Sequence, residues 1–396
     1  MRGVEEMEIK ELNEKDYLES MKLSMYAFQY KIPEESIASR IEMLKRHKVI
    51  GVWDNNNLAA KLHIIPYQIS INGEEWKMGG VAGVATYPEF RRNGYVKRLI
   101  IEALERMHKE EQIVSLLHPF DIGFYRKFGW EIFTENKKIQ IEKKDLKFTE
   151  AQSGTIKRFT KETHHPDIET VYAQFSKKYM GMLVRDRTWW ANNIYGDGQI
   201  AVYYNQNSEA QGYVLYEVKE RKMDVQEFVV LTQEARCGLW NFICQHDSMV
   251  EEVSILTSSH ELLPFTLHQP KVKMEVTPYF MARIVDAEQC LLKYSFMDIG
   301  KKVFLHLEDE YAPWNIGSYL IADGEVKVYK EKPGSNCVQP PQRGVRLDIN
   351  SLTALLFGYK RPAELYELGY IKGKEEEIAD LEELFPFNKP FFYDFF

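Results

Sequence analysis

From residue 84 to residue 97 the sequence reads Val84-Ala85-Thr86-Tyr87-Pro88-Glu89-Phe90-Arg91-Arg92-Asn93-Gly94-Tyr95-Val96-Lys97. This order predicts a strand that ends at Thr86, a short basic turn, and a helix that opens near Gly94. Apolar residues then recur on one helical face, as in a helix packed on a core: Val96, Leu99, Ile100, Ala103, Leu104 and Met107. The first turn of a helix presents unpaired N–H groups and a partial positive charge, so it can bind a phosphate.

The residues before this helix strengthen the prediction of an anion site. Gly94 has no Cβ, so a ligand can approach the backbone closely. Arg91 and Arg92 add fixed positive charge at the same place. A diphosphate is the natural ligand of such a turn. The alternative is a solvated basic turn before a surface helix, which is the usual meaning of an isolated Arg-Arg-x-Gly pattern.

A second motif, Phe124-Tyr125-Arg126-Lys127-Phe128-Gly129-Trp130-Glu131, follows about thirty residues later, after a predicted strand at 113–117. In this order and at this separation, the two motifs resemble the GNAT superfamily of N-acetyltransferases. The resemblance implies that the arginine-glycine turn holds the pyrophosphate of coenzyme A. It also implies that the second motif supplies a tyrosine near the thioester sulfur.

The length and the aromatic ending, Phe391-Phe392-Tyr393-Asp394-Phe395-Phe396, resemble the Eis (enhanced intracellular survival) branch of this superfamily. Alternating strands and helices predict mixed α/β layers, and 396 residues exceed one ordinary core. The resemblance implies tandem GNAT-like domains, the second degenerate, and then a sterol-carrier-like α/β domain. We place these domains at 1–150, 151–285 and 286–396. In the second, Arg236 and Gly238 repeat the first turn weakly.

The cofactor residues of the family carry over to named positions. The resemblance implies that strand backbone meets the pantetheine arm at Val84, Ala85 and Thr86. It implies a phosphate cradle formed by Arg91, Arg92, Asn93, Gly94, Tyr95, Val96 and Lys97. Phe120 and Asp121 would flank the acetyl-CoA. Gly83 stands where a relative can carry a bulkier aromatic residue, so the shape of the acceptor pocket stays open.

Two groups fall on the family's catalytic positions: Tyr125 on the general acid, and the free carboxylate of Phe396 on the base. A phenol has a reference pKa of about 10, above the ~8.5 of a thiol, so it can protonate the departing thiolate. An α-carboxylate is a weak base for an ammonium, but aromatic surroundings would raise its pKa. Alternatively, the carboxylate orients the amine while a water carries the proton, or the tail docks only as hydrophobic packing.

Composition excludes several other classes of protein. A net charge of −8 argues against general nucleic-acid binding and fits cationic partners. The four cysteines, Cys237, Cys244, Cys290 and Cys337, lack metal-ligand spacing, so we expect no metal site. No apolar run approaches the ~20 residues that span a bilayer, and the charged N-terminus lacks an export signal. We therefore expect a cytoplasmic protein without a membrane or nucleic-acid partner.

The sequence thus predicts an acetyl-CoA-dependent enzyme that transfers acetyl directly to primary amines. The resemblance implies aminoglycoside-type polyamines and lysine amines as acceptors. It also implies a homo-oligomer, of which a hexamer is one candidate. The alternative is a non-catalytic protein that binds acyl-CoA or a lipid. A degenerate phosphate turn or a missing tyrosine would favour that alternative, and the first domain has neither.

Overall fold

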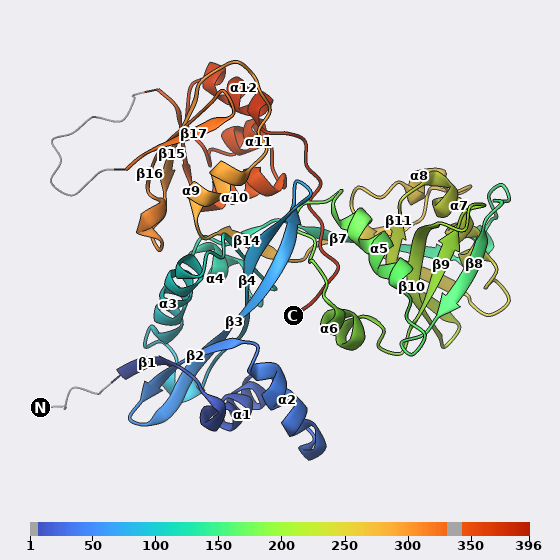
Figure 1. Ribbon diagram of the computed structural model, residues 1–396, viewed down its shortest axis with the longest axis horizontal. Helices are drawn as coiled ribbons and strands as arrows, with labels where there is room; N and C mark the ends of the chain where they lie inside the picture. Colours follow the sequence, from blue (N-terminus) through green and yellow to red (C-terminus); the bar gives the residue numbers. More distant parts are fainter. Residues whose placement is uncertain (1–6, 331–342) are drawn as a thin grey trace, which may run out of the picture.

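The computed structural model describes residues 7–330 and 343–396, which form three mixed β-sheets covered by helices (Figure 1). The predicted mixed α/β class is confirmed. The first sheet has the strand order β1 (Met7–Glu11), β2 (Lys48–Asp54), β3 (Asn57–Ile71), β4 (Glu74–Thr86), β5 (Val114–Leu117), β14 (Met281–Ile284) and β6 (Glu131–Ile132). Its helices are α1 (Tyr17–Phe28), α2 (Ile37–Leu44), α3 (Tyr95–Lys109) and α4 (Ile122–Arg126).

The second sheet has the order β13 (Lys273–Pro278), β7 (Glu135–Glu142), β12 (Glu252–Ser258), β11 (Lys222–Val230), β10 (Ala210–Lys219), β9 (Gln199–Tyr204) and β8 (Thr155–Phe159). Its helices are α5 (Pro166–Ser176), α6 (Arg187–Trp189), α7 (Gln233–Cys244) and α8 (Leu263–Thr266). The third sheet runs β17 (Glu325–Tyr329), β16 (Gly317–Ala322), β15 (Val303–Glu308) and β18 (Val345–Asp348). With it lie α9 (Ala287–Lys293), α10 (Ile349–Phe357), α11 (Pro362–Glu367) and α12 (Glu375–Leu384).

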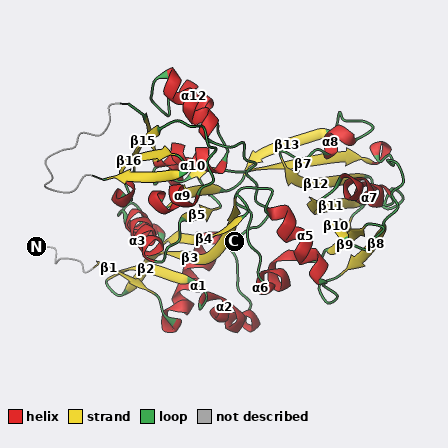
Figure 2. Cartoon of the chain, turned by 45° about the horizontal axis from the view of Figure 1, so that its top comes forward, coloured by secondary structure: helices red, strands yellow, loops and turns green. Residues whose placement is uncertain are grey.

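The first two sheets exchange strands. β7 follows β6 directly in the chain, yet it pairs with β12 and β13 in the second sheet. β14 follows β13, yet it returns to the first sheet and pairs with β5 and β6. Figure 2 shows β7 and β13 reaching from the first part of the molecule into the second sheet. The two sheets are therefore joined by main-chain hydrogen bonds as well as by side-chain packing.

Two irregularities in β4 shape the first sheet. β4 pairs with β5 only from Met78 to Gly80, so the two strands separate beyond Gly80. On its other side, the pairing with β3 shifts register, because Lys61 pairs with Ala85 but His63 pairs with Ala82. Such a bulge bends the strand and frees backbone groups from the ladder. The second half of β4 thus leaves an opening in the middle of the sheet.

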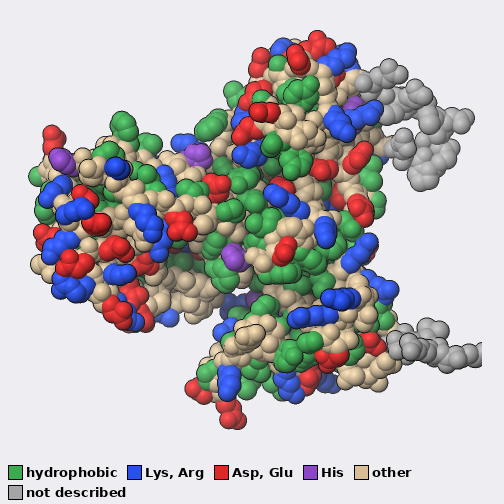
Figure 3. Space-filling model, turned by 180° about the vertical axis from the view of Figure 1, so that it is seen from behind, with side chains coloured by type: hydrophobic (Ala, Val, Ile, Leu, Met, Phe, Trp, Pro, Cys, Tyr) green, Lys and Arg blue, Asp and Glu red, His purple; other side chains and the backbone are tan. Residues whose placement is uncertain are grey.

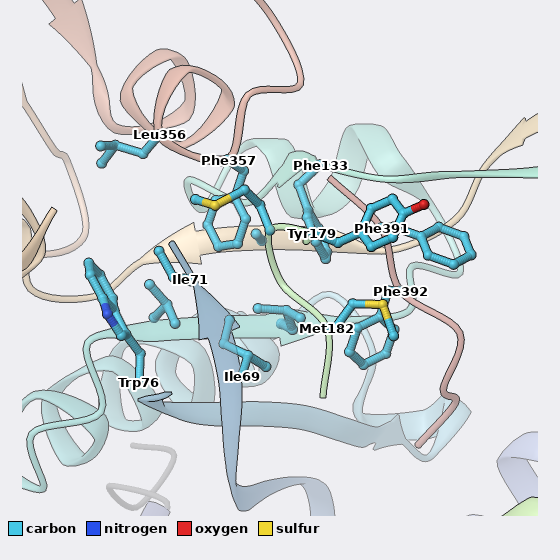
Figure 4. Close-up of a cluster of buried hydrophobic side chains, with 14 of the residues drawn as sticks. Ile69, Ile71, Trp76, Phe133, Tyr179, Met182, Leu356, Phe357, Phe391 and Phe392 are labelled. Atoms are coloured by element: carbon cyan, nitrogen blue, oxygen red, sulfur yellow. The ribbon is translucent and has the colours of Figure 1, made fainter. Parts of the chain in front are cut away.

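The aromatic C-terminal segment lies in a core shared by all three sheets. Figure 4 shows Phe391 and Phe392 among side chains from each part of the chain: Ile69, Ile71, Trp76, Phe133, Tyr179, Met182, Leu356 and Phe357. The backbone joins as well, since Met180 N–H donates to the Lys389 carbonyl at 2.8 Å. Residues 391–393 are buried in this core, whereas Phe395 is 61% exposed.

A buried lysine connects α1 to the first sheet. Lys61 of β3 is 1% exposed, and its Nζ donates to Ser20 Oγ at 2.8 Å and to Ser24 Oγ at 2.6 Å. Its third neighbour is His63 Nε2 at 3.0 Å, and His63 Nδ1 lies 3.3 Å from His47 Nδ1. Because burial disfavours the charged amine, the pKa of Lys61 falls to about 7, and the pKa of His47 falls to about 4.

This shift predicts how stability depends on pH. Between pH 7 and 10.5, the unfolded chain holds a proton on Lys61 that the folded chain has lost, so the free energy of unfolding rises with pH through that window. Below pH 7 both states are protonated and the full penalty for burying the charge remains. From pH 7 to pH 9 we expect the native chain to gain ~1–3 kcal/mol relative to Lys61→Met in urea titrations. The exposed Lys222→Met serves as control, and equal pH dependence in all three chains would refute this account.

Gly129 of the second motif gives a second prediction. Its φ is +90°, and an added Cβ would overlap the Arg283 guanidinium and lie 2.7 Å from Ile349 Cγ2. Positive φ costs an alanine ~1–2 kcal/mol, and overpacking costs a further ~1–3 kcal/mol. We therefore expect Gly129→Ala to lower the free energy of unfolding by ~2–5 kcal/mol, measured by urea denaturation. Gly123→Ala, whose added Cβ meets only Asp121 Oδ1 at 3.4 Å, should change it little.

Candidate functional site

The predicted phosphate turn lies at the open start of α3. Gly94 precedes the helix with φ of +77°, no side chain caps this helix start, and an added Cβ at Gly94 would meet no heavy atom within 4 Å. Arg92 also has a positive φ of 68°, which a non-glycine residue rarely adopts. The helix buries the face predicted for it, at Leu99, Ile100, Ala103, Leu104 and Met107. The turn therefore combines a helix start that no side chain caps, room for a ligand and a well-anchored helix.

The side chains of this turn differ in their contacts. Arg91 and Arg92 are exposed, and neither takes part in the ion pairs of the described residues. The Tyr95 hydroxyl donates to Asp54 Oδ2 at 2.6 Å. Lys97 Nζ lies 5.1 Å from the centre of the Tyr311 ring, so it contacts the part of the chain that carries the third sheet. The two arginines are thus available for an anion, whereas Tyr95 and Lys97 already have partners.

Tyr125 lies on the short helix α4, just after the strand that borders the opening. Asp121 caps this helix by accepting from Phe124 N–H at 2.6 Å. The Tyr125 ring is 3% exposed and meets the rings of Phe120 and Phe124 at 5.3 and 5.2 Å. Burial raises the pKa of Tyr125 above its ordinary value, so its phenol stays protonated. Asp121 thus holds the helix in place, and Phe120, which is exposed, lies beside Tyr125.

The last two residues of the chain lie where β4 and β5 separate. The Phe396 ring is 5.1 Å from Tyr67 and 5.2 Å from Phe280, and an added Cβ at Gly80 would come 2.7 Å from Phe396 Cε2. Gly80 is the last residue of β4 that pairs with β5. Phe395 lies 5.1 Å from the ring of His118, the residue after β5. Figure 1 shows this tail running down from α12 to end beside β3.

The structure brings some predicted residues together and leaves others apart. The bulge that holds Val84 and the tail that ends at Phe396 both border the opening between β4 and β5. In the described residues, no ring contact or hydrogen bond joins Phe396 directly to Tyr125. The proposed roles of all these site residues remain predictions.

One polar group beside the opening was missed from the sequence. An added Cβ at Gly83 would lie 3.1 Å from His63 Cδ2, and Gly83 has φ of +57° in the bulge. A bulkier residue at Gly83 would therefore strain the backbone and displace the His63 ring. The available signal was the polar pair Lys61 and His63 within the otherwise apolar run Leu58–Ile65. Alternate residues of a strand share one face, so the pair indicated a buried polar site.

The second copy of the turn has no room for a phosphate. Thr232 caps α7 by accepting from Ala235 N–H at 3.2 Å. Arg236 Nε donates to Glu261 Oε1 at 2.7 Å, so its charge is compensated. Gly238 lies inside the helix, where an added Cβ would overlap the Tyr203 ring. The second turn is closed by its own side chains, unlike the first.

The described residues offer no metal site and no membrane-spanning helix. No group of three or more His, Cys, Asp or Glu side chains in the described ranges could hold a metal ion. No helix in the part of the chain that the structure describes is long and apolar enough to cross a membrane. Cys237, Cys244 and Cys290 are free thiols, while Cys337 lies outside the described residues.

Comparisons with protein families divide the chain into three parts. An acetyltransferase (GNAT) domain model matches residues 8–133, and a second acetyltransferase (GNAT) domain model matches residues 181–284. A sterol carrier protein domain model matches residues 287–393. The predicted order of two GNAT domains and a sterol-carrier-like domain is confirmed.

Individual relatives agree with this architecture. An uncharacterized N-acetyltransferase of Streptomyces avermitilis is 20% identical over 380 residues, 89% of this chain and 88% of that protein. The N-acetyltransferase Eis of Mycobacterium tuberculosis is 26% identical over 201 residues, about half of each chain. A solved structure from Enterococcus faecalis, described as a probable N-acyltransferase, has a TM-score of 0.89 and 27% identity, covering 99% of this chain and 100% of that one.

The fold of Eis1 from Mycobacterium abscessus is likewise similar, with a TM-score of 0.80 and 18% identity over 99% of this chain and 100% of that one. The predicted resemblance to Eis and the predicted enzyme class are thereby confirmed. This chain belongs among the GNAT N-acetyltransferases, with the Eis-like arrangement of two GNAT domains and a sterol carrier protein domain.

Proposed function

We propose that the first GNAT domain transfers acetyl from acetyl-CoA directly to a primary amine, with Tyr125 as general acid and the Phe396 carboxylate as base. The observation that carries this proposal is the position of the chain end. Phe396 packs against Gly80, at the point where β4 and β5 separate, and Tyr125 lies on the helix that follows β5. Because the Phe396 ring is packed at this point, the carboxylate on the same residue lies close to the opening.

Acetyl-CoA fits the groups that surround the opening. We propose that its pyrophosphate binds at residues 91–97, where Gly94 leaves space and both arginines lack ion-pair partners among the described residues. The pantetheine arm would run along 84–86, where the bulge frees strand backbone for hydrogen bonds. Phe120 and Asp121 would flank it. Lys97 would have to leave Tyr311 to reach a phosphate, so the arginines carry more of the support.

The chemistry requires two proton movements. The amine nitrogen attacks the acetyl carbonyl carbon, the carbon–sulfur bond breaks, and the thiolate takes the phenolic proton of Tyr125. The raised pKa of Tyr125 keeps that proton in place until negative charge builds on sulfur. The amine loses its own proton to the Phe396 carboxylate, directly or through a water. Tyr125 then regains a proton from solvent, and the Phe396 carboxyl group releases its proton to solvent.

The acceptor would be a cationic amine. The chain has a net charge of −8, which attracts polyamines of the aminoglycoside type and lysine side chains alike. Figure 3 shows acidic and basic side chains mixed over one face of the molecule, so the attraction is general rather than confined to one acidic field. We further propose a cytoplasmic homo-oligomer that acts on these amines.

The test is the rate of CoA release from acetyl-CoA with a panel of polycationic amines. We expect Tyr125→Phe to lower kcat by ~10²–10⁴-fold, because the general acid is lost while the ring remains. A chain extended by Gly-Gly after Phe396 should lose a comparable factor, because its free carboxylate becomes an amide. Tyr329→Phe, an exposed tyrosine of the third sheet, is the matched control.

Three results would change the proposal. If Tyr125→Phe kept native kcat, the general acid would be another group. If the Gly-Gly extension kept native kcat, Phe396 would act only in packing. If the native chain bound acetyl-CoA but acetylated no amine, a protein that binds acyl-CoA without turnover would be the better description.

A further inference from the structure

A buried ionic cluster lies two residues before the chain end. The side chains of Asp394, Arg185 and Glu227 are 2%, 1% and 6% exposed. Arg185 Nε donates to Asp394 Oδ1 at 2.9 Å, and its Nη1 donates to Glu227 Oε2 at 3.2 Å. Arg185 and Glu227 both belong to the part of the chain that matches the second GNAT domain. That domain therefore binds the C-terminal tail through an ion pair between Arg185 and Asp394.

Asp394 is held through both its side chain and its backbone. Trp189 Nε1 donates to Asp394 Oδ1 at 2.7 Å, and the Tyr172 hydroxyl lies 3.3 Å from Oδ2. The backbone carbonyl of Asp394 accepts from the Tyr279 hydroxyl at 2.9 Å. Tyr279 comes just before β14, which belongs to the first sheet. Asp394 is thus fixed between the two GNAT domains.

Burying these three charged side chains costs desolvation free energy. Burial raises the pKa of Asp394, and the Arg185 charge opposes that rise. Desolvation of buried ion pairs often cancels their attraction, so a hydrophobic contact of similar size would stabilise the fold as well. Phe391 and Phe392 already supply such contacts. The ionic cluster adds directional hydrogen bonds, which define the position of Asp394 more narrowly than the packing of rings does.

The position of Asp394 limits where the chain can end. Two residues of extended chain span at most ~7 Å, so the Phe396 Cα, which carries the terminal carboxylate, stays within that reach of the Asp394 Cα. Within this reach Phe395 meets His118 and Phe396 meets Gly80, at the opening between β4 and β5. If Asp394 were released, the last two residues would keep only their ring contacts, and Phe395 is mostly exposed.

We propose that Asp394 is a positioning residue that sets the terminal carboxylate for catalysis, and that Arg185 and Glu227 give the second GNAT domain a part in the reaction. The inference rests on the proposed function, in which the Phe396 carboxylate serves as base. It adds that the second GNAT domain positions the Phe396 carboxylate, although the corresponding turn of that domain has no room for a phosphate.

The experiment is a double-mutant cycle in the full chain. Asp394→Asn keeps the size of the side chain and leaves Arg185 paired with Glu227. We expect kcat to fall ~10–100-fold with an unchanged KM for acetyl-CoA, since a displacement of about 1 Å can cost ~10²-fold. In the Gly-Gly-extended chain the carboxylate is already absent, so Asp394→Asn should lower kcat no further. Groups that act as one unit are non-additive in this way.

A matched control separates positioning from general destabilisation. Glu261→Gln also neutralises a buried carboxylate that pairs with an arginine of the same domain, Arg236. The hydrogen bonds and ion pairs of Glu261 do not involve residues 390–396. Its effect on kcat should be small and equal in the native and extended chains. If Asp394→Asn does not fold, Tyr279→Phe removes one bond to the Asp394 carbonyl and should show a smaller kcat loss with the same non-additivity.

The outcomes distinguish this inference from the proposed function. If the extension lowers kcat and Asp394→Asn lowers it further by its full factor, the positioning role is wrong and the base stands. If the extension alone leaves kcat unchanged, the terminal carboxylate is not the base, and the inference fails with it. If Asp394→Asn raises only the KM for acetyl-CoA, its role is in cofactor binding and the inference is again overturned.

Discussion

The burial of the C-terminal aromatic residues is the interaction on which the placement of the three sheets depends. Phe391 and Phe392 are fully buried in a cluster to which every sheet contributes side chains. Aromatic side chains bury more area than most, so a few of them can dominate such a contact. The same segment ends at the opening between β4 and β5, so the residues that pack the shared core also lead the chain to the candidate site.

The exchange of strands reinforces this arrangement. β7 and β14 cross in opposite directions, so the two GNAT sheets cannot separate without breaking main-chain ladders. Domains joined by a single linker are expected to move relative to one another. Here the exchanged strands join the domains that carry Tyr125 and Arg185 more firmly than a single linker would. This rigidity suits chemistry that depends on placement more than on the intrinsic strength of acid or base.

Local patterns predicted the parts of the site that are local in the chain. The turn at residues 91–94, the apolar face of α3 and the aromatic character of residues 391–393 were all visible as short runs of residues. The β14 insertion and the Arg185–Asp394 pair were not predicted. The two residues of that pair are 209 positions apart in the sequence. The spacing of apolar residues along a helix or strand does not indicate which distant residue a side chain will contact. Likewise, Gly83 could be identified as unusual, but its positive φ and the His63 ring beside it follow from the register of β3 and β4.

The position of β14 has a consequence for biosynthesis. The gap between β5 and β6 is filled by a strand that leaves the ribosome about 150 residues after β6. At 5–20 residues per second, the nascent first sheet waits roughly 8–30 s with two strand edges open. Open edges recruit foreign strands, so this interval is when the polypeptide most needs a chaperone.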